Sequence, residues 1–442
     1  MTSALATDLY QLTMMAGYVG ADHMGPNTFE LFVRELPERR AYLVVAGIEQ
    51  ALDYLETLRF TPAEIAWLRE TPALRGLPAR FFDEVLPTFK FTGEVWAVDE
   101  GEVVFNHEPI LRVTAPAAEA QLVETALLAF VTFQTSVASR TSRVVDAAQG
   151  RPVVEFGSRR AHGLEAARYA ARASYVAGCA GTSNVEAGWR HGIPVVGTMA
   201  HSWVMSFERE LDAFREYIRQ FGEATTLLID TYDTVAAARA IVAAGLRPSA
   251  VRLDSGDLAG LARSVRAIFD AGGLGGTHIL VSGDLDEYRI QALLKRQPPI
   301  DAFGVGTAIS AVSDAPALGG VYKLVETTRA GVPVPTLKLS TGKRTYPGRK
   351  QAWRITDRGL ATHDVLGLAD EPVPGGRPLL QRVMRKGRRL APGPSLDEVR
   401  RCCRSRIEQL PPSVRALDAH EELPVKISHG LDALVRTVVS PH

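Results

Sequence analysis

Cysteine is scarce in this sequence of 442 residues, which contains only Cys179, Cys402 and Cys403. The number is odd, two of the three are adjacent, and no CxxC or Cys/His spacing occurs. A disulfide framework and a structural zinc site are therefore excluded as the basis of the fold, and the composition is typical of a reducing compartment. We expect a cytoplasmic protein whose stability comes from a large hydrophobic core.

Long apolar runs and a net charge are also absent. No run reaches the roughly 18 apolar residues that a transmembrane helix needs. The N-terminal segment MTSALATDLYQLTMMAGY lacks a basic region and carries Asp8 inside its apolar stretch, so we expect no signal peptide. The 50 basic residues balance 50 acidic ones, which gives no support for a nucleic-acid or anionic-membrane binder. We expect neither partner.

Short apolar runs alternate with amphipathic helical segments through the middle of the chain. The alternation predicts βαβ units and a parallel sheet. An irregular (β/α) barrel is the favoured architecture, and a doubly wound open sheet is the alternative. The runs lie at residues 152–157, 175–184, 194–202, 225–234, 249–258, 278–286 and 302–308, with 321–326 as a candidate to close the set.

The two flanks differ from this middle part. Strand-like pieces near the N-terminus and the Pro-, Gly- and Arg-rich end predict a mixed α+β domain formed from both chain ends. We therefore predict an N-terminal mixed domain over residues 1–120, a barrel domain over 121–326, and a β-rich region over 327–442 that completes the first domain. The basic segment near 385–410 is expected to be loop-like, with a terminal helix near 412–419, and no function is assigned to it.

Polar and glycine residues recur where the apolar runs end, which is the carboxyl edge of the predicted sheet. Backbone N–H groups at Gly283–Asp284 and Gly306–Thr307 are suited to phosphate, and Arg159 and Arg252 can donate paired hydrogen bonds to phosphate oxygens. Any one of these motifs is more often turn chemistry or helix capping than a ligand site. Their repetition on one edge favours a polyanionic substrate.

Asp254 and His201 are candidates for chemistry at the same edge. Asp254 stands at a strand tip, where a carboxylate can receive sugar hydroxyls or hold Mg²⁺ through water. His201 follows Gly-Thr-Met-Ala at a strand end, where an imidazole can act as a nucleophile toward phosphorus or as an acid or base. The pattern alone leaves a structural role for this histidine equally open.

The order and wording of these motifs resemble the nicotinate phosphoribosyltransferase family. The similarity extends over roughly the first three quarters of the chain, and its pieces are ATDLYQLTMMAGY, FELFVRELPERRAYLVVAGIEQAL, EFGSRRAHG, GTSNVEAG, PVVGTMAHSW, LIDTYDT, VRLDSGDL, FGVGTAIS and GGVYKLVE. The resemblance implies an irregular α/β barrel packed on a mixed domain from both chain ends. It also implies a homodimer whose active sites lie at the subunit interface.

The resemblance further implies a reaction. Nicotinate would displace pyrophosphate from phosphoribosyl pyrophosphate to give nicotinate mononucleotide, a ligase-type glycosyl transfer in NAD biosynthesis. ATP would drive the reaction through a transient phosphohistidine, with Mg²⁺ as cofactor. The metal ligands are not assigned.

The site residues follow from the same resemblance. The implied catalytic residues are His201, which would accept phosphate from ATP, and Arg252 and Asp254, which would hold pyrophosphate and ribose hydroxyls. The implied substrate-binding residues are Tyr10 and Phe156 on the two faces of the pyridine ring, Arg159 at the carboxylate or pyrophosphate, Ser183 near the ring, Gly283 and Asp284 beside the ribose, and Gly306 and Thr307 at the 5′-phosphate. Tyr10 would serve the neighbouring subunit.

Other functions were compared with this one. Nicotinamide phosphoribosyltransferases carry an aspartate near the position of Ser183, so the serine favours the acid as substrate. A quinolinate enzyme would need a denser basic pocket, and an aldolase-like barrel would need a strand-end lysine, for which Lys323 is the candidate. A non-catalytic ligand-sensing paralogue would have no reason to keep Tyr10, Arg159 and His201 together.

Overall fold

The computed structural model describes residues 3–338, 345–418 and 421–439 of the chain. They divide into two compact units: one contains the described residues of the ranges 1–136 and 317–442, and the other contains residues 137–316. The long helix α6 (Glu124–Ala147) begins in the first unit and ends in the second. The domain limits expected at 120/121 and 326/327 stay a prediction.

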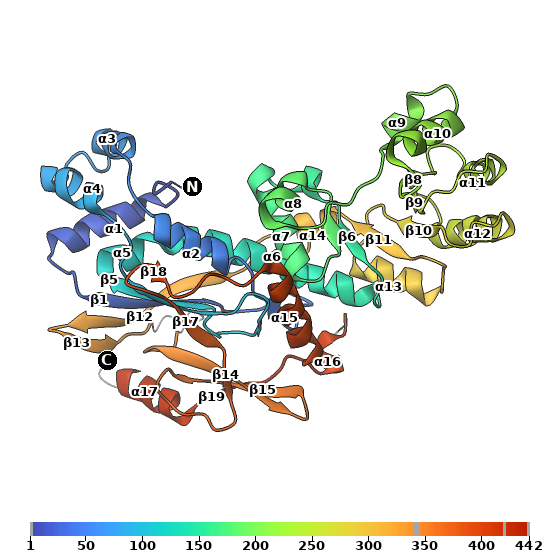
Figure 1. Cartoon of the computed structure of the whole chain (residues 1–442). Helices are drawn as coiled ribbons and strands as arrows, with labels where there is room; N and C mark the ends of the chain where they lie inside the picture. Colours follow the sequence, from blue (N-terminus) through green and yellow to red (C-terminus); the bar gives the residue numbers. More distant parts are fainter. Residues whose placement is uncertain (1–2, 339–344, 419–420, 440–442) are drawn as a thin grey trace. The chain divides into compact units, whose positions relative to one another are not determined.

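The first unit is built on a seven-stranded sheet that joins both ends of the chain. Strand β1 (Pro26–Val33) lies between β12 (Gly320–Arg329) and β5 (Leu111–Pro116) and is antiparallel to both. Strand β12 is also antiparallel to its other neighbour, β13 (Val332–Pro335). Beyond β5 lie β3 (Glu94–Val98), β17 (Leu380–Arg385) and β18 (Arg388–Arg389), and β13 forms the other edge. Figure 1 shows the N-terminal strand β1 beside the C-terminal strands. The predicted mixed domain formed from both chain ends is therefore confirmed.

Smaller sheets and helices complete this unit. The helices are α1 (Leu9–Gly20), α2 (Ile48–Thr57), α3 (Pro62–Glu70), the π-helical turn η1 (Phe81–Val85), α4 (Leu86–Thr88), α5 (Ala117–Leu122), α15 (Leu396–Glu408), α16 (Pro412–Arg415) and α17 (His429–Val439). The remaining strands are β2 (Leu43–Val44), β4 (Val103–Val104), β14 (Lys350–Asp357), β15 (Leu360–Leu368), β16 (Arg377–Pro378) and β19 (Val425–Ile427). Seven of the eight residues of β1 are buried, which follows from cover on both faces of the sheet.

Two expectations for the C-terminal part were wrong. Residues 321–326 do not close the barrel, because they lie in β12, where Tyr322 stacks on Phe29 of β1 at 4.8 Å between ring centroids. Much of the basic segment is a helix rather than a loop. Helix α15 begins with a capping box between Ser395 and Glu398, and it buries Val399, Cys403 and Ile407 along one face. The terminal helix expected at 412–419 is only α16, and residue 419 lies outside the described residues.

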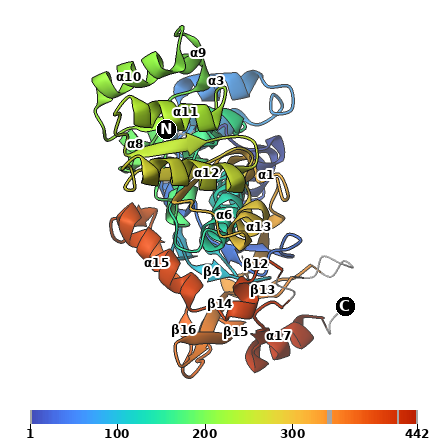
Figure 2. The ribbon, with the colours of Figure 1, turned by 90° about the vertical axis from the view of Figure 1, so that its right-hand side faces the viewer.

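The second unit carries the predicted parallel sheet, a curled half-barrel of six strands. In spatial order these are β7 (Gly181–Thr182), β6 (Val153–Glu155), β11 (Ala302–Val305), β10 (His278–Val281), β9 (Ala250–Leu253) and β8 (Thr226–Leu228). Every pair is parallel. The helices between them are η2 (Ser158–Arg160), α7 (Leu164–Val176), α8 (Val185–His191), α9 (His201–Met205), α10 (Glu210–Phe221), α11 (Thr234–Ala243), α12 (Leu258–Ala271), α13 (Glu287–Lys295) and α14 (Thr307–Ser310). Helices α11 and α12 lie next to each other (Figure 2).

One predicted strand of this unit is missing. Residues 194–202 meet the sheet only at a single bridge between Val195 and Thr182. Pro194 has no N–H to donate, and Val195 and Val196 are exposed, so the segment lacks the burial that a sheet strand needs. It runs instead as an extended loop to His201. No described helix combines the length and the apolar character that crossing a bilayer requires.

Candidate functional site

The carboxyl ends of the parallel strands bring most of the predicted site residues to one edge of the second unit. Parallel strands point the same way, so residues just after them share an edge. Phe156 follows β6, Ser183 follows β7, Asp254 follows β9, Gly283 and Asp284 follow β10, and Gly306 and Thr307 follow β11. Arg252 lies within β9, and His201 begins α9. Tyr10 lies in the other unit.

Arg252 is held in place by a threonine. Its Nη1 donates a hydrogen bond of 2.8 Å to the hydroxyl of Thr198, and its Nη2 lies 3.8 Å from Oδ1 of Asp254. Burial lowers the pKa of Arg252, while Asp254 and Asp230 raise it. Its Nε has no described partner. The guanidinium therefore keeps an unused donor at the edge where an anion is expected.

Asp254 is fixed from both its side chain and its backbone. Its Oδ1 accepts a hydrogen bond from the Ser282 hydroxyl, and its backbone N–H donates to Oδ2 of Asp230 at 2.9 Å. Gly283 adopts a left-handed conformation with φ +98°, and a Cβ there would lie 1.9 Å from the carbonyl oxygen of Asp254. The β9 and β10 loops can therefore touch only because residue 283 has no side chain.

Phe156 lies across the neighbouring strand end. A Cβ on Gly304 would lie 2.6 Å from ring atoms of Phe156, so the ring covers the backbone of β11. The backbone of Gly306 approaches the Phe156 carbonyl oxygen, since a Cβ there would lie 3.1 Å from it. The backbone of the residue predicted to cover the pyridine is thus beside the glycine predicted to bind phosphate.

Glu155 links the ends of β6, β7 and β11 through hydrogen bonds. Its buried carboxylate accepts hydrogen bonds from the hydroxyls of Thr182 at 2.5 Å and Ser310 at 3.1 Å, and from the backbone N–H of Gly157. Burial raises the pKa of Glu155, and these hydrogen bonds oppose the rise. Ser183 donates its backbone N–H to the Glu155 carbonyl oxygen at 2.9 Å. The carboxylate is therefore occupied in holding loops together.

His201 contacts a hydroxyl on the next strand end. Its Nδ1 lies 3.1 Å from the hydroxyl oxygen of Thr231, which follows β8. One ring nitrogen is thereby engaged, and the side chain is partly exposed. Because the Thr231 contact fixes the ring orientation, Nε2 is the atom left for chemistry.

Two acidic residues lie close to this histidine loop. Glu210 is the first residue of α10, and partial burial together with the charges of Asp230 and Asp233 raises its pKa to about 7. Glu210 Oε1 and Asp230 Oδ1 are both buried without a described partner. Asp230 Oδ2, by contrast, accepts from Asp254 and from the Ser255 hydroxyl.

The remaining predicted residues are more exposed. Arg159 is exposed and its Nη1 lies 3.5 Å from the Phe156 carbonyl oxygen, while its charge acts on Arg252. Asp284 has φ +47° and its side chain is exposed, as is Thr307 at the start of α14. Tyr10 on α1 is 48% exposed, and its hydroxyl lies 3.5 Å from Oε2 of Glu124.

Metal binding by protein side chains alone is not supported. Among residues 3–338, 345–418 and 421–439, no group of three or more His, Cys, Asp or Glu side chains is placed to hold an ion. Mg²⁺, however, usually binds through one or two carboxylates together with substrate phosphates. Asp254 and the unpartnered Oδ1 of Asp230 fit that description.

Sequence reasoning missed the residues that position the others. Thr198, Asp230, Thr231 and Ser282 contact Arg252, Asp254 or His201. The first three lie inside the motifs quoted above, and Ser282 lies in the apolar run at 278–286. The signal was their place in those motifs. Glu210 lies outside every motif and gave no signal.

Three family models match the chain in succession. They are the nicotinate phosphoribosyltransferase N-terminal domain over residues 5–132, the nicotinate phosphoribosyltransferase family over residues 152–324, and the corresponding C-terminal domain over residues 375–435. A nicotinate phosphoribosyltransferase of Mycobacterium tuberculosis is 45% identical over 436 residues, which cover 96% of this chain and 91% of that protein. One from Bacillus subtilis is 40% identical over 382 residues, covering 84% and 77%. The crystal structure of human nicotinic acid phosphoribosyltransferase matches with a TM-score of 0.86 at 30% identity, covering 98% of this chain and 99% of that one.

Proposed function

This chain belongs to the nicotinate phosphoribosyltransferase family, and we propose that it joins nicotinate to phosphoribosyl pyrophosphate, giving nicotinate mononucleotide and pyrophosphate for NAD biosynthesis. The observation that carries the proposal is the cluster of side chains at the carboxyl edge of the parallel sheet. There Asp254 lies next to both Arg252 and Gly283, and Phe156 lies across the neighbouring strand end. The family predicted from the motifs is confirmed by the three successive family models.

The geometry suits a dissociative glycosyl transfer. As the bond from ribose C1 to pyrophosphate breaks, positive charge develops on the sugar and negative charge on the leaving group, and preorganised donors stabilise that change. Arg252, with its unused Nε, faces the leaving pyrophosphate, and Asp254 receives the ribose hydroxyls. The pyridine nitrogen attacks without losing a proton, so no general base is needed. Phe156 stacks on the ring and Arg159 binds its carboxylate.

ATP coupling would act through His201. The contact between His201 Nδ1 and Thr231 leaves Nε2 to attack the γ-phosphorus of ATP, forming an N–P bond as ADP leaves. The phosphohistidine adds negative charge beside Arg252 and the acidic residues of the β8 loop, and its hydrolysis releases phosphate. This gain and loss of charge can bias the loops between two positions.

Mg²⁺ would be held by Asp254 and Asp230 together with phosphate oxygens of the substrate. When bound, the ion would neutralise part of the negative charge on the pyrophosphate. Asp230 also receives the Asp254 N–H and the Ser255 hydroxyl, so it holds the β9 loop in place independently of the ion.

A homodimer is the proposed assembly, with Tyr10 of one subunit stacking on the pyridine in the site of the other. Support comes from large apolar side chains that this single chain leaves uncovered. Tyr10 itself is 48% exposed, and Val185 and Trp189 on α8 are 71% and 78% exposed. Exposed aromatic and aliphatic side chains of this kind are typical of protein interfaces. A cytoplasmic location is also proposed, and the three free cysteines support it.

The test is formation of nicotinate mononucleotide from nicotinate and phosphoribosyl pyrophosphate with Mg²⁺, with and without ATP, beside a parallel assay with nicotinamide. We expect product from nicotinate, strongly increased by ATP, and none from nicotinamide. His201→Ala should retain slow product formation and lose the ATP effect, whereas His278→Ala, at an exposed histidine at the opposite end of β10, should behave as the parent enzyme does.

Other outcomes would redirect the assignment. A preference for nicotinamide would show that Ser183 does not set acid specificity. Absence of product from either base, in protein shown to be folded and dimeric, would reject the enzyme and favour a ligand-sensing role. ATP stimulation that survives in His201→Ala would reject the phosphohistidine alone.

A further inference from the structure

A cavity lies entirely within the first unit, and none of the predicted site residues lines it. It has a volume of about 390 Å³ and lies between α2, the turn after β3, the β17–β18 hairpin and α15. Its apolar wall consists of Ile48, Leu52, Val98, Val383, Leu390 and Val399. A pocket of this size and character is in the range that holds small organic molecules.

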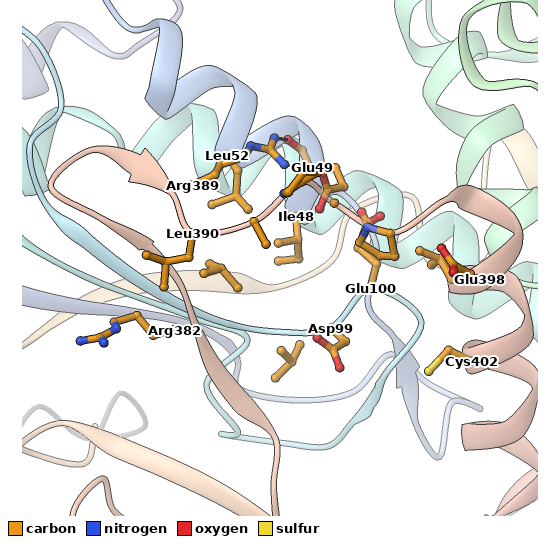
Figure 3. Close-up of a pocket in the computed structure, with 17 residues that line it drawn as sticks. Ile48, Glu49, Leu52, Asp99, Glu100, Arg382, Arg389, Leu390, Glu398 and Cys402 are labelled. Carbon is orange, nitrogen blue, oxygen red and sulfur yellow. Dashed lines mark hydrogen bonds and ion pairs between the residues drawn. The ribbon is translucent and has the colours of Figure 1, made fainter.

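The charges around this cavity are not balanced. Carboxylates come from Glu49, Asp99, Glu100 and Glu398, and the two cations are Arg382 and Arg389. Figure 3 shows the guanidinium of Arg389 turned toward Glu49, and that of Arg382 pointing away from the other labelled residues.

Both arginines already have acidic partners. Arg389 contacts Glu49 at 2.5 Å, Asp53 at 2.6 Å and Glu56 at 3.4 Å. Arg382 lies 3.3 Å from Glu94, which is outside the cavity. The arginines therefore do not neutralise the other carboxylates of the wall.

Asp99 is the carboxylate that lacks a partner. Its side chain makes no hydrogen bond or ion pair with any residue in the described part of the chain, whereas Glu100 accepts from the Gly47 N–H at 2.6 Å and Glu398 caps α15 through Ser395. The Asp99 side chain is exposed, so an ammonium group can reach its carboxylate from the cavity. Partial loss of solvent and the charge of Glu102 raise the pKa of Asp99, against the pull of Arg406 and Arg377.

We propose that this cavity, which we call the α2–α15 pocket, binds a small organic cation, with an apolar body against Leu52 and Leu390 and an ammonium group on Asp99. The pocket wall supplies apolar contact and a carboxylate, Asp99, that has no partner in the described part of the chain, and this combination selects amines over acids. The proposal does not depend on the reaction of the other unit.

The experiment uses three probes that share one apolar body: 2-(1-naphthyl)ethylamine, 2-(1-naphthyl)ethanol and 1-naphthylacetate. Affinities are measured by isothermal titration calorimetry on the full-length protein. We expect the amine to bind about fivefold more tightly than the alcohol, the scale of one partly exposed ion pair, and the acetate to bind least.

Asp99→Asn should remove this preference and leave the affinity for the alcohol unchanged. Asp397→Asn removes a neighbouring charge outside the pocket lining and should change nothing. Ala391→Trp, at an exposed position on the rim, should weaken binding of both amine and alcohol.

Cys402 provides a readout of where the probe binds. It lines the pocket and is partly exposed, whereas Cys179 and Cys403 are buried. Saturating amine should slow alkylation of Cys402 by iodoacetamide, measured by mass spectrometry. Equal affinities of the three probes, an Asp99→Asn variant that still prefers the amine, or alkylation of Cys402 that the amine does not slow would each overturn the proposal.

Discussion

The guanidinium of Arg252 and the hydroxyl of Thr198 are joined by a hydrogen bond of 2.8 Å, between a sheet strand and the extended loop that leads to His201. This contact links the residue predicted to bind pyrophosphate to the loop predicted to carry the phosphohistidine. The loop has only one bridge to the sheet, so such side-chain contacts decide where its residues stand.

The first prediction tests that link. Thr198→Val removes the acceptor while keeping the side-chain volume, and a hydrogen bond to a charged group of this kind corresponds to about a tenfold loss in kcat/KM for phosphoribosyl pyrophosphate. Arg252→Lys keeps the charge but loses the paired N–H donors of the guanidinium, so kcat/KM should fall at least as much. In the double variant the losses should not multiply, because both changes remove the same orientation. Independent, fully multiplied losses would show that Thr198 does not position Arg252.

Much of the site could be predicted because its members follow parallel strands. Asp254, Gly283 and Gly306 each come directly after an apolar run, and parallel pairing brings such residues to one edge whatever the details of the loops. The mixed domain was predictable because short strand-like pieces, such as TFELFVRE at residues 28–35, occur near both chain ends.

The rest could not be predicted from local pattern. Residues 194–202 resemble a strand by composition, but burial decides against it, and burial depends on neighbours distant in sequence. The many arginines around Cys402 and Cys403 made this segment look like a solvated loop. It is the helix α15, which its capping box and its buried face define. The charge of Asp230 acts on Glu210, a helix start 20 residues earlier in the chain, and no spacing rule predicts that the two acidic side chains come close.

Glu210 predicts a pH dependence of stability. Its pKa rises from 4.5 to about 7 in the folded chain, by partial burial and by Asp230 and Asp233. Between these values the native state keeps a proton that the unfolded state loses, so the free energy of unfolding falls as pH rises through this window. Glu210→Gln should remove that loss. At pH 8 the gain is about 1 kcal/mol, reduced because solvent screens the half-exposed group, or roughly 2–4 °C in thermal midpoint.

The check is a set of thermal unfolding curves at pH 5 and pH 8. At pH 5 the parent and Glu210→Gln should unfold at nearly the same temperature, and they should separate at pH 8. Glu208→Gln, at an exposed position two residues earlier, should match the parent at both values. A Glu210→Gln midpoint that lies below the parent's at pH 8 would contradict the assignment.

The buried ion network of the first unit predicts a large loss of stability for one substitution, at Arg354, and almost none for another, at Glu108. Arg354 donates to Asp364 at 2.6 and 3.0 Å and to Glu102 at 3.0 Å, all with buried side chains. Arg354→Met leaves the buried carboxylate of Asp364 without its cation, while Glu102 keeps Arg377 and Arg406, and the loss should cost about 3–5 kcal/mol. Burial and the charge of Asp364 raise the pKa of Glu108 well above its usual value, which favours its protonated form.

Glu108→Gln tests whether this acid is protonated in the folded chain, because the amide has the same shape and no charge. A protonated Glu108 loses no charge in this change, so we expect a thermal midpoint at pH 7 within about 2 °C of the parent's, a change of well under 1 kcal/mol. A large destabilisation in Glu108→Gln, comparable to that in Arg354→Met, would mean that Glu108 carries a charge that Arg354 needs.

Gly283 predicts the sharpest effect on activity. A Cβ at this position would lie 1.9 Å from the Asp254 carbonyl oxygen, and φ is +98°. Gly283→Ala must therefore push the β9 and β10 loops apart, which displaces Asp254 and its bond from Ser282. A shift of about 1 Å in a positioning group lowers kcat/KM by on the order of 100-fold, and steady-state assays with varied phosphoribosyl pyrophosphate measure the loss.

Gly273→Ala separates steric contact from backbone strain. Gly273 also has a positive φ of +70°, but no atom lies within 4 Å of a Cβ built there. Its substitution should cost about 1–2 kcal/mol of stability through the left-handed conformation alone and leave kcat/KM unchanged. Should Gly283→Ala lose no more activity than Gly273→Ala, the close approach of the two loops would have no part in catalysis. A loss confined to Gly283→Ala would place the contact with Asp254 among the requirements of the site, because both positions have a positive φ and only at position 283 would the new methyl group meet another residue.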